Sequence, residues 1–305
     1  MAERVCVIVN PAAGRGRGAR ALDDVRTAFG AEGITDIRIT EAKEGERAVA
    51  TRAIDEGATT LVAVGGDGTW SNVANAVLAA GAGDAVRLAL VAAGTGNDFA
   101  KTVGAPASDV AATARLVVEG TDTRVDVGRV EDHFFLNISG FGFDIAVLED
   151  ISSIPWLTGD AVYLVSALRQ LVGYGGVDID ITSPARRRGA VRHLMLVVAN
   201  ARNFGGAFRI APDASLTDGA LDAISIHDAS TLRRLKLFGS ATKGTHVALD
   251  EVVTEQAASF IVRFGAPPAY ETDGEYRQAR TADLEIACVP GALRIVAAGP
   301  GSTHP

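Results

Sequence analysis

Cysteine and aromatic residues are scarce in this chain. Two of the 305 residues are cysteines, Cys6 and Cys288, and each lies in a short apolar run without the paired spacing of a metal site. We therefore expect two buried strand residues and no disulfide. Phe, Trp and Tyr make up only 6% of the chain, whereas the 34 glycines favour tight turns and close backbone approaches.

Positive charge and long apolar runs are also missing. The formal net charge of −8 argues against a nucleic-acid-binding protein. No uncharged apolar run approaches the roughly 18 residues that a membrane span requires, and the N-terminus lacks a secretory signal pattern. A composition of 48% hydrophobic and 22% charged residues is typical of a packed chain. We expect a cytoplasmic protein, so any membrane contact must rest on a local patch.

The first part of the chain alternates short apolar runs with helical patterns. This rhythm predicts an α/β domain with a parallel sheet and helices on both faces. The expected strands are 5–9, 36–40, 60–64 and 88–91, and the expected helices are 19–29, 46–56, 70–78 and 109–119. We place Ser108 as the N-cap of the last helix and Gly120 just after its end.

The pattern changes near residue 125. Short strands separated by turns, such as Glu131-Asp132, predict a mostly antiparallel β-domain in which only residues 156–174 and 232–241 form substantial helices. The apolar run 292–298 is more typical of an α/β core strand, so we expect it to return to the first domain. The predicted domains are therefore 1–125 with a returning strand at 291–300, and 126–290.

The motif Gly65-Gly66-Asp67-Gly68-Thr69 lies between a predicted strand and a predicted helix. Its glycines allow the backbone to approach a ligand closely, and the helix N-terminus attracts phosphate. A carboxylate in such a loop would repel phosphate unless a metal ion or a transferable proton intervened. Asp67 is therefore a candidate for Mg²⁺ binding or acid–base catalysis. The alternative is a tight turn in which Asp67 caps the helix.

Two further loops repeat this arrangement. Residues 94–98 (Gly-Thr-Gly-Asn-Asp) follow the strand at 88–91, and residues 10–16 follow the first strand. Ligands gather at the carboxyl ends of strands in open parallel sheets, so the three loops predict one phosphate site. Neither a Walker motif nor a dinucleotide-binding glycine motif is present in its usual context, and simple glycine turns remain the alternative.

These motifs resemble the diacylglycerol kinase catalytic domain family, which includes bacterial diacylglycerol kinases, sphingosine kinases and ceramide kinases. The resemblance continues in order over nearly the whole chain, through residues 124–128, 137–144, 211–214, 218–222 and 273–275. It implies an N-terminal domain like that of NAD kinases and phosphofructokinases, followed by a β-sandwich domain. The implied activity is an ATP- and Mg²⁺-dependent lipid kinase, most simply one that converts diacylglycerol to phosphatidic acid.

The resemblance also implies roles for individual residues. Asp67 and Asp98 would bind Mg²⁺, and Asp126 would help to organise the reacting groups. Glu275 would be the general base, although that role is also ascribed to the aspartate that matches Asp67. The residues expected to hold ATP are Asn10, Gly65, Gly66, Gly68, Thr69, Thr95, Asn97 and Asp98.

A structural Mg²⁺ site is implied at Asp218, with backbone carbonyls near Leu216 and Leu221 as further ligands. The alternative for this segment is a hairpin turn.

Several functions and partners stay open at this point. One alternative is that the acceptor is another lipid, namely a sphingoid base, ceramide or a glycolipid. A second is that the acceptor is a soluble molecule such as NAD. A third is that the chain is a non-catalytic nucleotide- or lipid-binding protein. The filled acidic positions argue against the last alternative. A lipid kinase would act peripherally at the inner face of the cell membrane, and a homodimer would be ordinary.

The lipid-facing surface is also open. The apolar segment 156–174 is either a core helix or one wall of an acyl groove. Cationic side chains are candidates for contact with anionic headgroups, although charge runs are often only solvated faces. These cations are Arg15, Arg17, Arg169, the run 186–188 and the pair 233–234.

Overall fold

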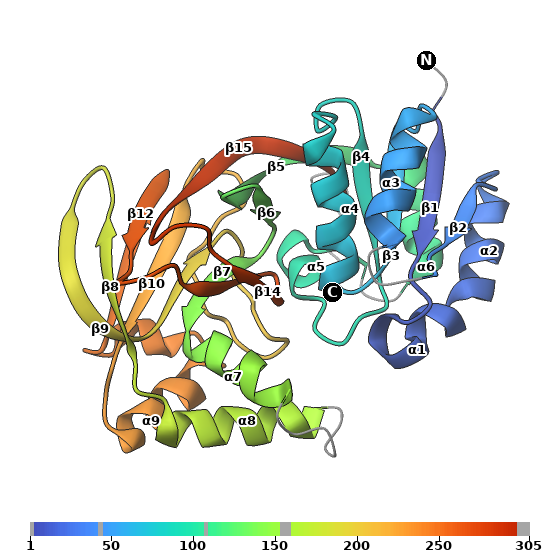
Figure 1. Cartoon of the computed structure of the whole chain (residues 1–305). Helices are drawn as coiled ribbons and strands as arrows, with labels where there is room; N and C mark the ends of the chain where they lie inside the picture. Colours follow the sequence, from blue (N-terminus) through green and yellow to red (C-terminus); the bar gives the residue numbers. More distant parts are fainter. Residues whose placement is uncertain (1–2, 42–44, 107–108, 153–159, 298–305) are drawn as a thin grey trace. The chain divides into compact units, whose positions relative to one another are not determined.

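The computed structural model describes residues 3–41, 45–106, 109–152 and 160–297 (Figure 1). The chain divides into two compact units, which are Met1–Val127 with Val289–Pro305, and Gly128–Cys288. Strands β5 (Thr121–Val130) and β15 (Asp283–Ala297) each continue from one unit into the other. Among the described residues, no helix has both the length and the apolar character needed to span a membrane.

The first unit contains a parallel sheet. Its strand order is β15-β4-β3-β1-β2, and residues Arg294 and Ile295 of β15 pair in parallel with Arg87 and Leu88 of β4. The strands are β1 (Val5–Val9), β2 (Ile37–Ile39), β3 (Thr60–Gly65) and β4 (Arg87–Ala92). The apolar runs of β1, β3 and β4 are buried on both sides, as a parallel sheet covered by helices requires, whereas Ile39 of the edge strand β2 is 42% exposed.

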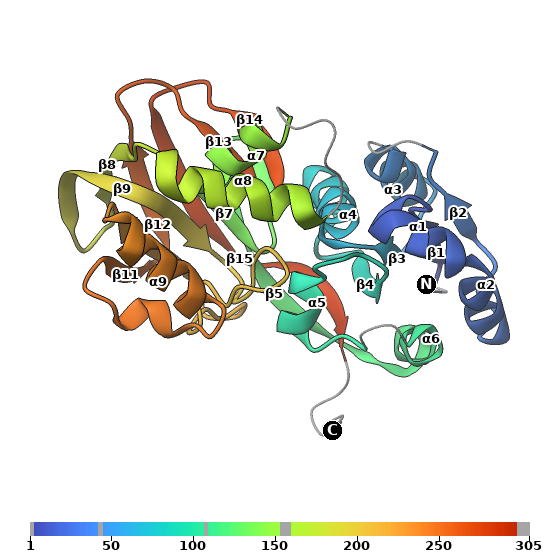
Figure 2. The same ribbon diagram turned by 90° about the horizontal axis from the view of Figure 1, so that it is seen from below.

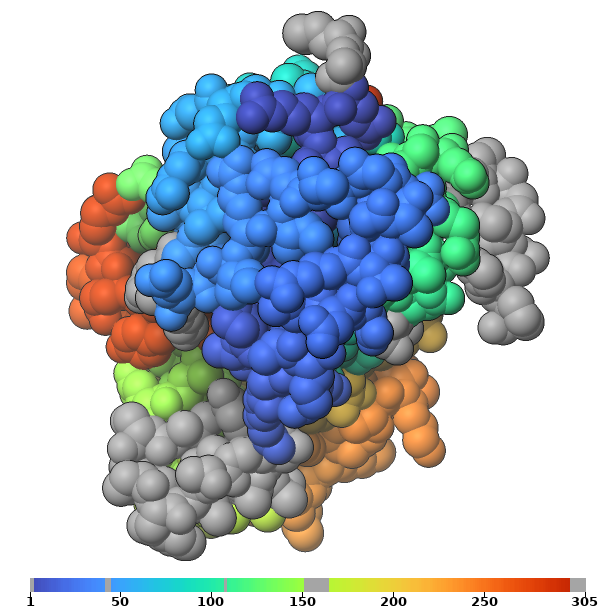
Figure 3. All heavy atoms as spheres, turned by 90° about the vertical axis from the view of Figure 1, so that its right-hand side faces the viewer, coloured from blue at the N-terminus to red at the C-terminus, as the bar shows by residue number. Residues whose placement is uncertain are grey.

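Helices cover both faces of this sheet (Figure 2). Phe29 and Val117 pack with Val9 and Val64 on one face. On the other face, Trp70 is buried and its Nε1 donates to the carbonyl of Ala63 at 3.2 Å. The helices are α1 (Ala13–Arg20), α2 (Leu22–Ala31), α3 (Gly45–Asp55), α4 (Asp67–Ala79), α5 (Asp98–Val103) and α6 (Val110–Glu119). Figure 3 faces the side of this unit that carries β2 and α2, whose atoms are blue.

The starts of α6 and α4 differ from the prediction in ways that bear on the site. The N-cap of α6 is Asp109, whose side chain accepts from the amide of Ala112 at 2.8 Å, whereas the predicted cap Ser108 lies outside the described residues. Helix α4 begins at Asp67, three residues before the predicted start, because the extended backbone of Gly66 serves as its N-cap. The Gly-Asp-Gly-Thr segment is thus mostly the first turn of a helix.

The second unit is mainly antiparallel. Its main strand order is β14-β13-β7-β9-β8-β12-β15, and β10 pairs with β9 and β11. The parallel and antiparallel parts of this one mixed sheet confirm the predicted α/β plus β fold class. The strands are β6 (His133–Phe135), β7 (Ile138–Gly142), β8 (Val177–Thr182), β9 (Arg187–Ala199), β10 (Leu221–His227), β11 (Val252–Ala257), β12 (Ser259–Arg263), β13 (Ala269–Thr272) and β14 (Glu275–Gln278).

Strand β9 separates two apolar cores. Leu196 and Val198 pack into one core, whereas Met195, Val197 and Ala199 pack into the other. Successive strand residues point to opposite faces, and an apolar run without polar alternation therefore marks a strand buried on both sides. The second core is covered by α7 (Phe143–Ser152), α8 (Asp160–Gly173) and α9 (Thr231–Ala241), and a short 3₁₀ helix spans Thr245–Ala248.

The helices of this unit depart from the prediction in two ways. Helix α7 was not predicted: its first two residues belong to the motif 137–144, and the remaining residues were left unassigned. Helix α8 begins at Asp160, and residues 156–159 of the predicted helix lie outside the described residues. Cys6 and Cys288 form no disulfide with each other, and Cys6 is fully buried whereas Cys288 is partly exposed. Burial raises the pKa of the Cys6 thiol to about 12.

Candidate active site

Three glycine-containing loops of the first unit converge at the carboxyl ends of β1, β3 and β4. We number the loops in chain order, as residues 10–16, 65–69 and 94–98. The amide of Ala93 donates to the carbonyl of Gly65 at 2.7 Å, which joins the second loop to the third. A side chain on Gly94 would overlap Gly66, and one on Gly14 would overlap the carbonyl oxygen of Ala93. Close backbone packing therefore requires glycine at these positions, and the loops form one continuous surface.

Asn10 ties the first loop to two helices. Its Nδ2 donates to Oε1 of Glu46 in α3 at 2.6 Å and to Oγ1 of Thr69 in α4 at 3.1 Å. Its Oδ1 accepts from the amide of Ala12 at 2.9 Å. Two residues predicted to bind ATP are thus in direct contact. The buried Glu46 was missed from the sequence, because the contact that buries it joins residues far apart in the chain.

The first turn of α4 is open to a ligand. The first N–H groups of a helix have no helical partners and carry a partial positive charge. At Gly68, in this turn, an added Cβ would meet no atom within 4 Å. The turn therefore has room beside Gly68, at a helix start whose N–H groups are of the kind that bind phosphate groups.

Asp67 lies at the start of the same turn. Its Oδ1 accepts from the amide of Phe99 in α5 at 3.0 Å. Burial raises the pKa of Asp67 above its ordinary value, the Phe99 amide opposes this shift, and the charge of Asp98 adds to it. A carboxylate with a raised pKa is a stronger base, which suits a group that accepts a proton.

The third loop is held by Asn97. Its Oδ1 accepts from the amide of Gly94 and its Nδ2 donates to the carbonyl of the same residue, each at 3.0 Å. Asn97 adopts left-handed backbone angles, with φ 52°, which asparagine tolerates better than most residues. Thr95 accepts from Nη2 of Arg17 at 3.1 Å. Sequence analysis placed Arg17 among the headgroup candidates, and the structure places its guanidinium beside the third loop.

Asp98 and Asp126 are both buried in the first unit. Oδ1 of Asp98 pairs with Nζ of Lys101 at 3.0 Å, and Oδ1 of Asp126 accepts from the amide of Gly291 at 2.7 Å. In the described part of the chain, no three Asp, Glu, His or Cys side chains are arranged to hold a metal ion. Asp67, Asp98 and Asp126 therefore do not form a preformed three-ligand centre.

In the second unit, a tight turn carries Asp273 and Glu275. Asp273 and Gly274 both have positive φ angles, of 51° and 87°, as in a two-residue hairpin turn between β13 and β14. The Asp273 carboxylate accepts from three consecutive amides, those of Leu136 and Asn137 at 2.8 Å and that of Ile138 at 3.2 Å. The turn is thus fixed to the start of β7.

Glu275, the predicted base, is partly exposed at the start of β14. Its Oε2 accepts from Nη2 of Arg277 at 3.1 Å, and Nε of Arg277 donates to Oγ1 of Thr272 at 2.6 Å. Arg277 therefore holds the carboxylate in place. It was missed from the sequence, although its position two residues after Glu275 on a strand puts both on one face.

A buried pair of acids lies behind this turn. Glu271 of β13 and Asp144, at the start of α7, are both buried and close to Gly140. Asp144 belongs to a motif found in the sequence, whereas Glu271 was not singled out.

The implied structural metal site at Asp218 is a turn in this structure. Oδ1 of Asp218 accepts from the amide of Ala220 at 3.1 Å, and Oδ2 accepts from Nε2 of Gln256 at 2.9 Å. Leu216 and Leu221 lie on either side of the turn and are buried. Both carboxylate oxygens thus have hydrogen-bond partners within the protein.

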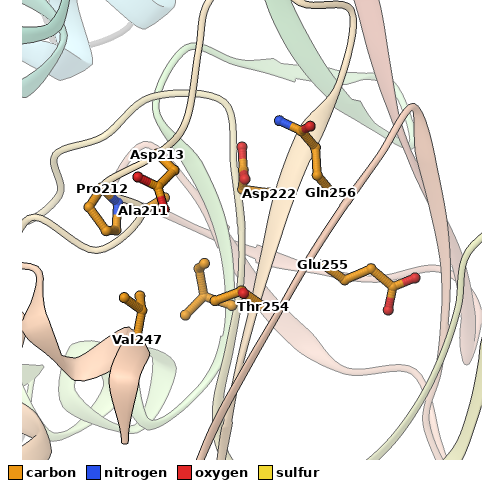
Figure 4. A pocket seen from close by; sticks show the side chains of 9 residues that line it. Ala211, Pro212, Asp213, Asp222, Val247, Thr254, Glu255 and Gln256 are labelled. Atoms are coloured by element: carbon orange, nitrogen blue, oxygen red, sulfur yellow. The ribbon is translucent and has the colours of Figure 1, made fainter.

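A cavity of about 120 Å³ lies next to this turn (Figure 4). Burial raises the pKa of Asp222 to about 6, and the charges of Asp218 and Asp213 add to the shift. The cavity is lined by Ala211, Pro212, Asp213, Asp222, Ile224, Val247, Thr254, Glu255 and Gln256.

Comparison with known proteins identifies the family. The family model of the diacylglycerol kinase catalytic domain matches residues 4–130, and that of the YegS C-terminal NAD kinase beta sandwich-like domain matches residues 137–297. The chain belongs to the family of proteins with a YegS C-terminal NAD kinase beta sandwich-like domain, here preceded by a diacylglycerol kinase catalytic domain. This confirms the resemblance found in the sequence and supports a kinase.

Individual relatives agree with this family. A diacylglycerol kinase from Mycobacterium tuberculosis is 28% identical over 300 residues, covering 96% of this chain and 94% of that protein. The crystal structure of a diacylglycerol kinase from Bacillus anthracis matches with a TM-score of 0.72 at 19% identity, over 99% and 98% of the two chains. An NAD kinase from Archaeoglobus fulgidus in complex with ATP matches with a TM-score of 0.55 at 11% identity, over 97% and 94%. The structural likenesses show a shared fold.

Proposed function

We propose that this chain transfers the γ-phosphoryl group of ATP to a lipid hydroxyl in a Mg²⁺-dependent reaction, with diacylglycerol as the acceptor. The observation that carries this proposal is the convergence of three glycine loops on the N-terminus of α4, beside Asp67. The names of the relatives support diacylglycerol as the acceptor.

The loop residues fit the phosphates of ATP. The first turn of α4 has open space beside Gly68, and Thr95 and Asn97 lie on the neighbouring loop. Arg17 brings a positive charge to Thr95. Donors and cations arranged in advance are what phosphoryl transfer needs most, because the protein contributes mainly alignment and charge neutralisation.

The carboxylates fit a magnesium ion that keeps other ligands. Mg²⁺ usually takes one or two protein carboxylates and completes its shell with water and phosphate oxygens, so two aspartates suffice. Asp67 and Asp98 are close enough for the charge of one to act on the other. When bound, the ion would neutralise charge on the phosphates. The Asp126 carboxylate would be held in place, because it accepts a hydrogen bond from the amide of Gly291.

The transfer step needs one proton acceptor. The acceptor hydroxyl oxygen forms a bond to the γ-phosphorus, the bond from phosphorus to the bridging oxygen breaks, and ADP leaves. The hydroxyl proton passes to a carboxylate late in this process. Asp67, with its raised pKa, and Glu275, held by Arg277, are the two candidates for this base.

The test is transfer of radiolabelled phosphate from ATP to dispersed diacylglycerol, a sphingoid base, ceramide and NAD, with Mg²⁺ or with a chelator. We expect labelled phosphatidic acid that disappears with the chelator. Replacing the true base, by Asp67→Asn or Glu275→Gln, should lower kcat about 10²–10⁴-fold. ATP binding, measured by calorimetry, should persist in Glu275→Gln.

Other results would change the proposal. Label only in another lipid would keep the mechanism and replace the acceptor, and label only in NAD would overturn the lipid assignment. ATP binding without label in any acceptor would indicate a non-catalytic nucleotide-binding protein.

A further inference from the structure

Helix α8 carries two apolar stripes, and only one of them faces the core. Ala167 and Leu171 pack into the core of the second unit. Val165, Leu168 and Val172 follow at helical spacing on the outside, and Val172 is 70% exposed. A helix that only covers a core needs one apolar stripe, so the outer one requires another explanation.

Helix α9 shows the same arrangement. Leu237 packs into the same core, and the buried Arg234 donates to the carbonyl of Leu171 at 3.0 Å. Leu232 and Leu235 point outward, and Leu232 is 80% exposed. Of the cationic pair 233–234, Arg234 therefore serves as a structural link between the two helices, contrary to its prediction as a headgroup contact.

The two outer stripes share one face of the unit. Because α8 and α9 pack their inner residues against the same core, their outer residues point away from the same sheet. Figures 1 and 2 both show the two helices side by side. We call the exposed residues Val165, Leu168, Val172, Leu232 and Leu235 the α8–α9 face.

Both helices of this face carry exposed cations. Arg169, Arg233 and Lys236 are exposed on the two helices, and α9 contains no acidic residue. Arg169 and Arg233 pair with Asp150 and Glu251, whose carboxylates are 8% and 15% exposed. The cations are thus the more accessible partners, in a chain whose net charge is −8.

We propose that the α8–α9 face docks on an anionic lipid bilayer. Apolar side chains among cations are the features that place a helix in the headgroup region of such a membrane. A second copy of the chain fits less well, because a symmetric contact would bring like charges together. This inference rests on the proposed lipid kinase function and adds the surface through which the enzyme would reach its acceptor.

The test is flotation with vesicles of phosphatidylcholine alone or with 30 mol% phosphatidylglycerol. We expect binding to the anionic vesicles only. Leu168→Glu and Leu232→Glu should each weaken binding more than tenfold, and Lys236→Gln about fivefold. Val118→Glu is the matched control, because Val118 is an exposed helical valine of the first unit, 49% exposed against 48% for Leu168; its binding should be unchanged.

A second assay separates this inference from the proposed function. With a short-chain diacylglycerol below its micellar concentration, the face variants should keep the wild-type kcat while losing activity on vesicles. Vesicle binding that depends on the face, without turnover of any lipid, would support the surface and refute the function. Wild-type protein that ignores anionic vesicles, or that binds them equally in all variants, would overturn the inference. So would a dimer in sedimentation that Leu232→Glu dissociates.

Discussion

Asp144 and Glu271 bury their carboxyl groups side by side next to Gly140. A Cβ on Gly140 would overlap Oδ2 of Asp144 and would lie 3.0 Å from Oε1 of Glu271. Burial raises the pKa of Asp144 to about 6, and burial together with the Asp144 charge raises the pKa of Glu271 well above its usual value. The raised pKa values mean that the pair retains a proton at a higher pH than isolated carboxyl groups do.

This pair predicts a pH-dependent stability. A carboxyl group with a raised pKa in the folded state stabilises the fold below its unfolded pKa, near 4.5 for Glu271, and loses that contribution as the pH rises through the folded value. Glu271→Gln removes the titrating charge. We expect it to match the wild-type melting temperature at pH 4.5 and to exceed it at pH 8, as measured by calorimetry.

The control is Glu285→Gln, which alters an exposed carboxylate on β15 and should change stability by less than about 0.5 kcal/mol at either pH. A melting temperature for Glu271→Gln that falls below wild type at pH 8 would contradict the retained proton.

Substitution of Gly68 or Gly94 by alanine should have opposite effects on stability. Gly68→Ala fills open space in a helix, so it should stabilise the fold by about 0.5–1 kcal/mol. It should nevertheless weaken ATP binding, because the methyl group enters the proposed phosphate site. Gly94→Ala would overlap Gly66, and it should lower both stability and ATP affinity. Thermal unfolding and ATP titration check both variants. Unchanged ATP affinity in Gly68→Ala would show that the phosphates of ATP do not bind beside Gly68.

Asp273 predicts a strong stability effect from a turn residue. Asp273→Ala leaves three backbone amides without their acceptor, so we expect a loss of about 3 kcal/mol or more. Asp218→Ala is the matched control, because that turn carboxylate is exposed and accepts from the backbone amide of Ala220 rather than from three amides; its loss should stay below about 1 kcal/mol. Denaturant unfolding compares the two, and equal losses would show that the amides of residues 136–138 find other acceptors.

Two substitutions of Asp126 should separate its contribution to stability from its contribution to catalysis. Asp126→Asn keeps an oxygen that can accept from Gly291, so stability should change by about 1 kcal/mol or less, whereas Asp126→Ala should cost about 1–3 kcal/mol. If the charge helps to organise the reacting groups, Asp126→Asn should still lower kcat more than tenfold. Wild-type turnover by a stable Asp126→Asn protein would restrict Asp126 to a structural role.

The strands and the loop cluster were predictable because their causes are local. The apolar runs 60–64 and 88–91 are buried strands, and parallel strands bring the loops after them to one edge. Helix α5 was missed because the acceptor for one of its first amides, that of Phe99, is Asp67, about thirty residues earlier in the chain. A local pattern does not reveal such a distant partner. Glu46 and Glu271 were missed for a related reason, since tertiary packing rather than local pattern buries an acid. The charge of Arg17 was noticed, but its partner Thr95 comes from another loop.

The shared strand β15 also sets an order of events during synthesis. Its residues Arg294 and Ile295 pair with β4, roughly two hundred residues earlier in the sequence. During synthesis on the ribosome, one edge of β4 therefore stays unpaired until the whole second unit and β15 have emerged. An unpaired strand edge is prone to join other chains, so completion of this sheet by β15 is the step most exposed to aggregation.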